Sequence, residues 1–316
     1  MALSSPAQIA HDVAPDVVRR QLTGRKVDVA GRALQVFLWF SLALTVSILV
    51  VLVGSQVAGS SSVFDGRFGD FMSGTLRSIA TDAGIHQGLR GTFWIGVIVV
   101  VVAFPLGIAA AVYIEEYAPK SRLTRFIDVN VRNLAGVPSV VFGILGLTVF
   151  VKALEGVTGG RSVIAGGITL AIMVLPIVII TSAEAIRAVP DSLREGGYGA
   201  GATRWEVVRT QILPYAAPGM LTGTVLSLAR AMGEAAPLIL VGAVSDRLGS
   251  DPAIFDISSL TERFTAMPNV ITTWSGRPQE GFPSLTSAAI VVLLVIVLAA
   301  NSFAILLRNR FEKKRR

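Results

Sequence analysis

The sequence predicts an all-α membrane protein with six transmembrane helices. The chain of 316 residues contains six long apolar runs, 52% of its residues are hydrophobic and only 16% are charged, and its mean hydropathy is +0.65. A water-soluble domain carries a more charged surface, so this composition indicates that lipid surrounds much of the chain. Only helices and closed barrels satisfy their backbone groups in lipid, and the runs lack the alternation of barrel strands, so we expect helices.

Each apolar run is long enough to cross a bilayer, because a hydrocarbon core of about 30 Å requires roughly 20 helical residues. The predicted spans are residues 33–54, 92–114, 134–154, 163–180, 217–241 and 285–307. The first run is longer than the apolar part of a signal peptide and begins far from residue 1. We therefore expect it to be a retained anchor.

Lys and Arg residues are unevenly distributed between the two sides of these spans. Nineteen of the 28 lie in the two tails and in the loops after spans two and four, whereas eight lie in the three opposite loops. Because loops rich in Lys and Arg stay in the cytoplasm, we expect both ends of the chain to be cytoplasmic. The predicted organisation is a tail over residues 1–32, a six-span domain over 33–307 and a basic tail over 308–316.

Cysteine and histidine, which build many catalytic and metal centres, are rare or absent in this chain. The chain has no cysteine, and its two histidines are His11 in the predicted tail and His86 in a polar loop. We expect no disulfide, metal site or histidine catalysis, which disfavours the alternative of an intramembrane enzyme. No Gly-x-x-x-x-Gly-Lys-Ser/Thr motif is present, so we expect no nucleotide cofactor on this chain. The net charge of +7 lies in tails and alternate loops, which favours membrane orientation over nucleic-acid binding.

The loop over residues 182–216, on the predicted cytoplasmic side, has a pattern typical of two short helices. Pro190 starts the first, with Asp191 or Ser192 as its N-cap. Four glycines between residues 196 and 201 are expected to interrupt this helix.

The second helix of the loop begins after this glycine cluster. Thr203 and Glu206 have the spacing of a capping box, Pro214 is expected to end the helix and Pro218 to open span five. The result is a helix, a bend and a helix on one face of the membrane, a shape that a partner protein can bind.

This loop resembles the EAA loop of bacterial ABC importer permeases, which reads Glu-Ala-Ala, three residues, Gly, nine residues and Ile-x-Leu-Pro. The residues at the matching positions are Glu195, Gly196, Gly197, Gly201, Leu213 and Pro214. Both alanines are replaced by glycine, and Gln211 takes the isoleucine position. The resemblance implies that the loop is a coupling helix, which docks in a groove of a separate ATPase subunit.

Span five carries a charged pair, Arg230 and Glu234. At 1.5 Å per residue, Arg230 lies roughly 18 Å beyond Pro218, near the middle of the bilayer. An Arg there costs at least about 2.5–3.5 kcal/mol, so it should face a bundle interior or a water-filled path.

Two roles are open for this pair, because side chains four residues apart share one face of a helix. In the first, the two charges neutralise each other and serve helix packing alone. Alternatively, Arg230 binds a tetrahedral oxyanion through its paired donors. Glu234 then holds Arg230 while the path is empty, or accepts a hydrogen bond from a protonated substrate oxygen, which phosphate has and sulfate lacks.

Around the pair, the sequence resembles the phosphate permeases of ABC importers. Their motif Ala-Arg-Ala-x-Gly-Glu-x-Ala-Pro matches residues 229–237, and residues 133–148 and 166–181 agree as well. The ending Gly-Glu-Ala-Ala-Pro is similar to the PstA type, whereas the alternative sulfate and molybdate permeases usually end in Gly-Glu-Phe-Gly. The resemblance, over roughly residues 92–308, implies a MetI-like fold.

The same resemblance implies a function and a set of partners. The chain would be no enzyme but half of the translocation pathway of an inorganic phosphate importer in the bacterial plasma (inner) membrane. Its implied partners are a PstC-like second permease, a PstB-like ATPase dimer that uses the ATP, and a PstS-like external phosphate-binding protein.

Overall fold

The computed structural model describes residues 29–244, 248 and 254–313, and none of these residues forms a strand. The chain divides into two compact units, Met1–Ser55 and Gln56–Arg316. The predicted N-terminal tail lies outside the described residues as far as residue 28, as do residues 314–316 of the predicted basic tail.

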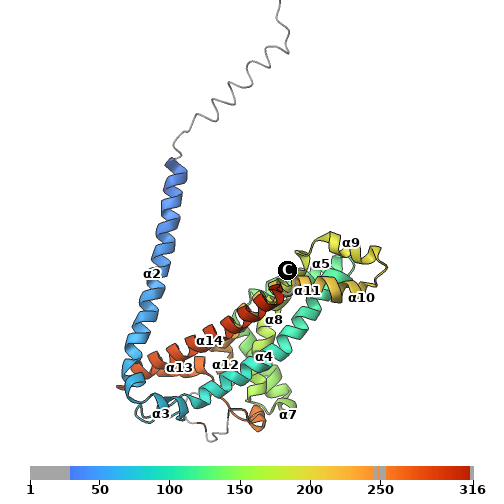
Figure 1. Cartoon of the computed structure of the whole chain (residues 1–316). Coiled ribbons are helices and arrows are strands. Elements are labelled where there is room, and N and C mark those ends of the chain that lie inside the picture. The colour runs from blue at the N-terminus through green and yellow to red at the C-terminus, as the bar shows by residue number, and fades with distance from the viewer. Residues whose placement is uncertain (1–28, 245–247, 249–253, 314–316) are drawn as a thin grey trace, which may run out of the picture. The chain divides into compact units, whose positions relative to one another are not determined.

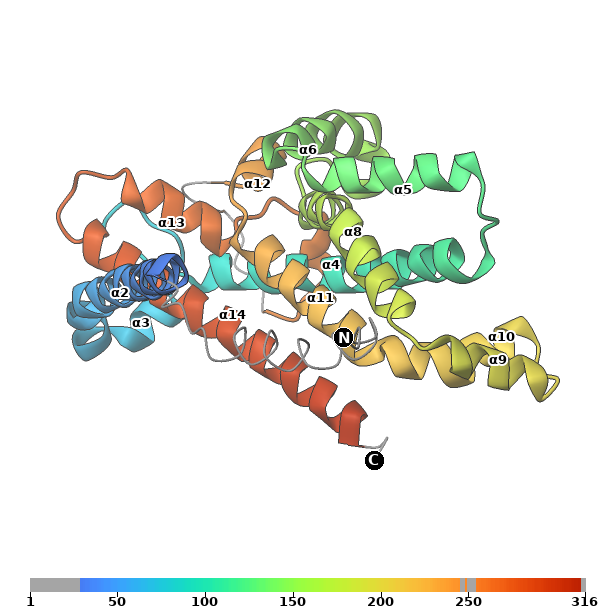
Figure 2. The ribbon, with the colours of Figure 1, turned by 90° about the horizontal axis from the view of Figure 1, so that it is seen from above.

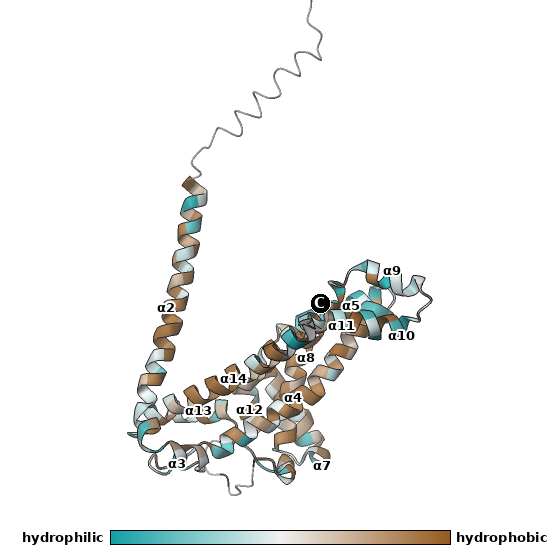
Figure 3. Ribbon diagram, viewed as in Figure 1, coloured by the Kyte–Doolittle hydropathy of each residue, from teal (hydrophilic) through white to brown (hydrophobic). Residues whose placement is uncertain are grey.

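Most of the long helix α2 (Val29–Gly66) belongs to the first unit. Apolar residues predominate in its middle part (Figure 3), and it is long and apolar enough to cross a membrane. The predicted first span, at residues 33–54, lies within it. The prediction of a helix there is confirmed.

The second unit is a bundle of helices (Figure 1). After the end of α2 it contains α3 (Phe68–Ser73), α4 (His86–Val112), η1 (Tyr113–Tyr117), α5 (Arg122–Ala135), α6 (Ser139–Gly146), η2 (Leu147–Ala153), α7 (Glu155–Thr158), α8 (Val163–Arg187), α9 (Asp191–Gly199), α10 (Arg204–Val207), η3 (Val208–Ile212), α11 (Leu213–Gly233), α12 (Ala236–Leu240), η4 (Ile257–Thr261), α13 (Met267–Ser275) and α14 (Phe282–Lys313). The segments η1, η2 and η3 are π-helical, and η4 is a 3₁₀ turn.

Helix α8 is at the centre of this unit (Figure 2). It packs most extensively against α4 and α11, and 67% of its most apolar stretch is buried. Glycines allow the close approach: a Cβ on Gly107 of α4 would lie 2.6 Å from Cγ1 of Val178, and one on Gly223 of α11 would lie 2.2 Å from Oγ1 of Thr181. The close packing of α4, α8 and α11 forms the scaffold that positions the loop residues.

The third predicted span, at residues 134–154, is not one straight helix. Helix α5 ends at Ala135, and α6 with η2 continues after a bend of 99°. Pro138 at the N-cap of α6 explains the break, because proline disfavours helical backbone at the preceding Val137. The prediction of an unbroken span was wrong here, and the part after the bend extends for only about 22 Å at the rise of an ideal helix.

The fifth predicted span, at residues 217–241, is also broken. Helix α11 ends at Gly233, Glu234 has extended backbone, and the short helix α12 begins at Ala236. Pro237 accounts for the break, since in a continuous helix its ring would clash with the carbonyl of Gly233 and it has no N–H to donate. Helix α12 instead turns to pack against α6.

Among the described residues, five helices are long and apolar enough to cross a membrane. The number becomes six if α5 and α6 with η2 are counted as one bent span. The predicted all-α membrane class is therefore confirmed, and the sixth span is the bent one.

Candidate functional site

Helices α9 and α10 form the helix–bend–helix structure expected for the loop, at the same end of the second unit as α5 (Figure 1). Helix α9 begins at Asp191, directly after Pro190, and no side chain caps it. Asp191 accepts instead from Nη1 of Arg194, 3.0 Å away. The prediction of an N-cap at Asp191 or Ser192 was therefore wrong.

The glycine cluster does not interrupt α9 where the sequence predicted. Gly196, Gly197 and Gly199 all lie within the helix. The bend comes at Gly201, whose φ of +82° belongs to the left-handed region that favours glycine. Its N–H donates to the carbonyl of Tyr198 at 2.9 Å, so one glycine, and not the cluster, makes the turn.

The predicted capping box at the start of α10 is confirmed. The backbone N–H of Thr203 donates to Oε2 of Glu206 at 2.7 Å, and the backbone N–H of Glu206 donates to Oγ1 of Thr203 at 3.4 Å. These reciprocal bonds satisfy two of the free N–H groups at the helix start. They fix where the second helix of the loop begins.

The three residues at the Glu-Ala-Ala positions differ in their surroundings. Glu195 and Gly196 are exposed, and a Cβ on Gly196 would meet nothing. A Cβ on Gly197 would lie 2.8 Å from Cγ2 of the fully buried Val207 of α10. Glycine at 197 therefore lets the two helices pack closely, while Glu195 and Gly196 are free to face a partner.

Leu213 and Pro214 lie inside a continuous helical path from Arg204 to Gly233. The prediction that Pro214 ends one helix and Pro218 opens the next was wrong. The π-helical turn η3 precedes Pro214, and in it the N–H of Leu213 bonds to the carbonyl of Val208, five residues back. Such a turn shifts the bonding register, which helps to accommodate a proline that has no N–H. The second helix of the loop and the part of span five up to Gly233 therefore form one continuous helical path.

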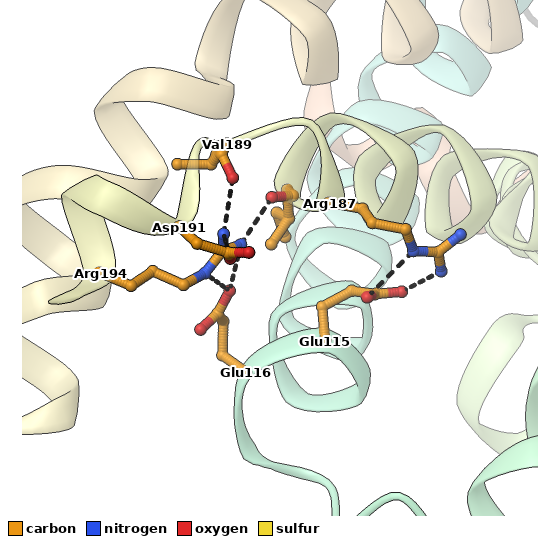
Figure 4. A network of polar contacts seen from close by, with 7 residues as sticks. Glu115, Glu116, Arg187, Val189, Asp191 and Arg194 are labelled. Atoms are coloured by element: carbon orange, nitrogen blue, oxygen red, sulfur yellow. Dashed lines mark hydrogen bonds and ion pairs between the residues drawn. The ribbon is translucent and has the colours of Figure 1, made fainter.

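Two Arg–Glu pairs connect this loop to η1, the π-helical segment that directly follows α4 (Figure 4). Arg194 of α9 donates to Oε1 of Glu116 at 3.0 Å, and to the carbonyls of Val189 and Ile186 at 2.6 and 2.9 Å. Only 18% of the Arg194 side chain and 6% of the Glu116 side chain are exposed.

The second pair joins the end of α8 to the same π-helical segment. Arg187 donates to both carboxylate oxygens of Glu115. Together the two pairs hold the end of α8 and the start of α9 against η1. We name the four residues Glu115, Glu116, Arg187 and Arg194 the charge clamp.

Sequence reasoning missed the charge clamp. The available signal was the pair of adjacent carboxylates, Glu115 and Glu116, immediately after the second apolar run on a side that is otherwise rich in Lys and Arg. The distribution of cations alone does not reveal these carboxylates. Residues 72 and 78 positions apart form these pairs, so their pairing depends on how α4 and α8 pack.

The predicted charged pair of span five is formed, although not on one helical face. Nε of Arg230 lies 3.6 Å from Oε1 of Glu234. Arg230 is in the last turn of α11, and Glu234 is the C-cap residue of α11, at the break before α12. Half of the Arg230 side chain and 22% of the Glu234 side chain are exposed within this chain. The pair therefore lies at the interruption of a span.

Comparison with known proteins identifies the family. Residues 103–316 match the model of the binding-protein-dependent transport system inner membrane component. The chain belongs to this family. It is therefore a multi-pass membrane permease of an ABC transporter and not itself an enzyme.

The sequence relatives include several permeases. The chain is 32% identical over 251 residues to the probable ABC transporter permease YqgI of Bacillus subtilis, covering 77% of this chain and 84% of that one. It is 32% identical over 234 residues to the phosphate transport system permease PstA 1 of Mycobacterium tuberculosis, covering 74% and 72%. The predicted likeness to PstA-type permeases is thus confirmed.

Solved structures support the MetI-like fold. A bacterial ABC transporter that imports the polysaccharide alginate has a chain that matches with a TM-score of 0.60 at 15% identity, covering 95% of this chain and 99% of that one. A chain of the MetNI methionine transporter matches with a TM-score of 0.51 at 17% identity, covering 72% and 94%. At these identities the likeness concerns the fold alone.

Proposed function

We propose that this chain is the PstA-type subunit of an ATP-driven importer of inorganic phosphate and forms half of its translocation pathway. The observation that carries the proposal is the pair of Arg230 and Glu234 at the break between α11 and α12. The PstA relatives in Mycobacterium and Yersinia support phosphate as the substrate.

The broken span suits the passage of an anion. Interrupted membrane helices expose backbone groups and commonly surround substrate sites near the bilayer midplane. Arg230 offers a planar guanidinium with several donors, which matches an oxyanion better than an ammonium does. Glu234 neutralises Arg230 while the path is empty. When phosphate arrives, its protonated oxygen donates to Glu234 and its charged oxygens accept from Arg230.

Transport needs energy from a partner, which reaches this chain through the loop. Glu195, Gly196 and Gly201 present the docking surface to one subunit of a PstB-like ATPase dimer. Because α10, η3 and α11 form one helical path, a displacement of the docked loop moves the helix that carries Arg230. The permease then alternates between inward-open and outward-open packings as the ATPase closes and opens.

The remaining partners and the orientation follow from the same assignment. A PstC-like permease supplies the other half of the pathway, and a PstS-like protein delivers phosphate from outside the plasma membrane. Both ends of the chain and the α9–α10 loop face the cytoplasm, as the distribution of Lys and Arg indicates.

Uptake by cells that lack other phosphate importers tests the substrate. Cells that produce the whole assembly should take up labelled phosphate, and a large excess of unlabelled sulfate or molybdate should leave the rate unchanged. Transport of sulfate or molybdate in preference to phosphate would assign the chain to another oxyanion. Transport of another oxyanion is the second candidate function, because the names of the relatives YqgI and YqgH give no substrate.

A further inference from the structure

A hollow of about 490 Å³ lies between η1, the start of α5 and the end of α8. Its volume falls within the range of roughly 300–1,000 Å³ that small-molecule sites occupy. The lining includes four cations, Lys120, Arg122, Arg125 and Arg187. This hollow is separate from the Arg230 pair and from the docking residues of α9 and α10.

Both acidic groups in the lining are already paired. Glu115 accepts from Arg187 within the charge clamp, and Asp128 accepts from Nε of Arg132 at 3.1 Å. Lys120, Arg122 and Arg125 are exposed and form no ion pair within the described part of the chain. Three cations therefore line the hollow without forming an ion pair to any carboxylate in the described ranges.

The backbone adds to this positive character. The hollow includes Ser121, the N-cap of the 14-residue helix α5, whose Oγ accepts from the N–H of Thr124 at 3.2 Å. Helix starts carry a partial positive charge and free N–H groups. The hydroxyl of Thr124 donates to the carbonyl of Pro119 at 2.7 Å, which fixes the turn that forms one wall.

We propose that this hollow binds a phosphate group, held by Lys120, Arg122 and Arg125 at the start of α5. Arginine forks and helix starts both suit phosphate oxygens. Arg187 is engaged by Glu115, so the contacts to the anion fall to Lys120, Arg122 and Arg125.

This phosphate group has two sources that the same chemistry would accept. One is free inorganic phosphate in the solution that bathes this end of the helices. The other is the headgroup of an anionic lipid. The lipid source is supported by the opposite face of α5, where Leu123, Phe126 and Ile127 are 67%, 66% and 41% exposed, the arrangement of a helix at a membrane surface.

A single cysteine at the rim of the hollow tests the proposal. Pro119 is exposed, lines the hollow and is uncharged, and the chain has no native cysteine. Pro119→Cys is introduced into the full chain within its assembled complex, and the rate of maleimide labelling of this chain is measured. One arm adds inorganic phosphate in detergent, and the other compares bilayer discs of phosphatidylcholine alone with discs that also contain phosphatidylglycerol.

Labelling should slow several-fold in at least one arm, and that arm identifies the source. Arg122→Gln combined with Arg125→Gln should abolish the protection, whereas Arg310→Gln, an exposed cation on α14, should preserve it. Lys120→Gln provides a milder variant if the double change reduces assembly. The proposal fails if neither source slows labelling, if protection survives the loss of the cations, or if position 119 does not react in the assembled complex.

Discussion

Arg194 of α9 donates a hydrogen bond of 3.0 Å to Glu116 of η1, across 78 residues of sequence. The carboxylate is almost fully buried, and the same guanidinium also bonds to two backbone carbonyls. This contact anchors the first helix of the proposed docking loop to η1, which directly follows α4. If a partner docks on α9 as proposed, this pair offers a path by which its force would reach the central helices.

Glu116→Gln should weaken this anchor, because it removes the negative charge that faces Arg194. A hydrogen bond to a charged group contributes about 1.5–3 kcal/mol, so we expect lower thermal stability of the assembled complex and reduced uptake per complex. Asp191→Asn is the matched control, since Asp191 bonds to the same Arg194 but 87% of its side chain is exposed. Equal effects of the two changes would argue against a special role for Glu116.

Gly201 and Gly199 form a matched pair for testing the bend. A Cβ on either residue would meet nothing in the described part of the chain, but of the two only Gly201 has positive φ. Gly201→Ala should strain the bend by about 1–2 kcal/mol and lower uptake, whereas Gly199→Ala, in a helix, should be tolerated. Gly201→Asp should abolish uptake while the protein stays in the membrane, since in the proposed docking its larger side chain would face the ATPase. Normal uptake by Gly201→Asp would show that the docking surface lies elsewhere.

The close approach of α9 to α10 predicts a difference between two adjacent glycines. Gly197→Leu should lower the stability of the permease chain by about 1–3 kcal/mol, because the side chain would overlap buried Val207. A Cβ on Gly196 would meet nothing among the described residues, so Gly196→Leu should leave the stability of the same chain nearly unchanged. Thermal unfolding of the purified permease chain without the ATPase compares them. A loss that is as large for Gly196→Leu would contradict the packing described.

Local patterns in the sequence predicted local structure well. The capping box at Thr203 and Glu206 depends on residues three positions apart, and the long apolar runs depend on composition alone. Both were therefore readable without knowledge of packing. The pair of Arg230 and Glu234 was found for the same reason, although the helix between them ends earlier than periodicity suggested.

Features that depend on packing could not be predicted in this way. Hydropathy conceals the breaks at Pro138 and Pro237, because the apolar runs continue through both prolines. Pro138 accounts for the first break but does not fix the angle of 99° at which α6 with η2 continues. Pro214 misled in the opposite direction, since the π-helical turn before it keeps the helix continuous. The charge clamp joins segments far apart in sequence, and no local spacing indicates such pairs.

The orientation can be tested with cysteines, because the chain has none of its own. Ser78 and Ser192 are both exposed and differ from cysteine by one atom. In intact cells an impermeant thiol reagent should label Ser78→Cys and not Ser192→Cys, and permeabilised cells should label both. Labelling of Ser192→Cys from outside would show that the predicted orientation is wrong, because the loop would then lie on the side opposite to a cytoplasmic ATPase.

Substitutions of Arg230 and Glu234 distinguish a role in phosphate transport from a role in helix packing alone. Arg230→Gln should stop phosphate uptake while assembly survives, because the proposed docking contacts lie on α9 and α10. Arg230→Lys keeps the charge but loses the planar fork, so it should also be impaired. If the pair serves packing alone, either single change leaves an uncompensated charge, and the combined change should restore function.

The combined variant Arg230→Gln with Glu234→Gln therefore tests the central claim most directly. The measurement is labelled-phosphate uptake in cells without other phosphate importers, normalised to the amount of assembled complex. If Arg230 binds the passing anion, the double variant should assemble in normal amounts and still carry almost no phosphate. Near-normal uptake by the double variant would contradict the proposed role and leave the pair as a structural contact between α11 and the break that follows it.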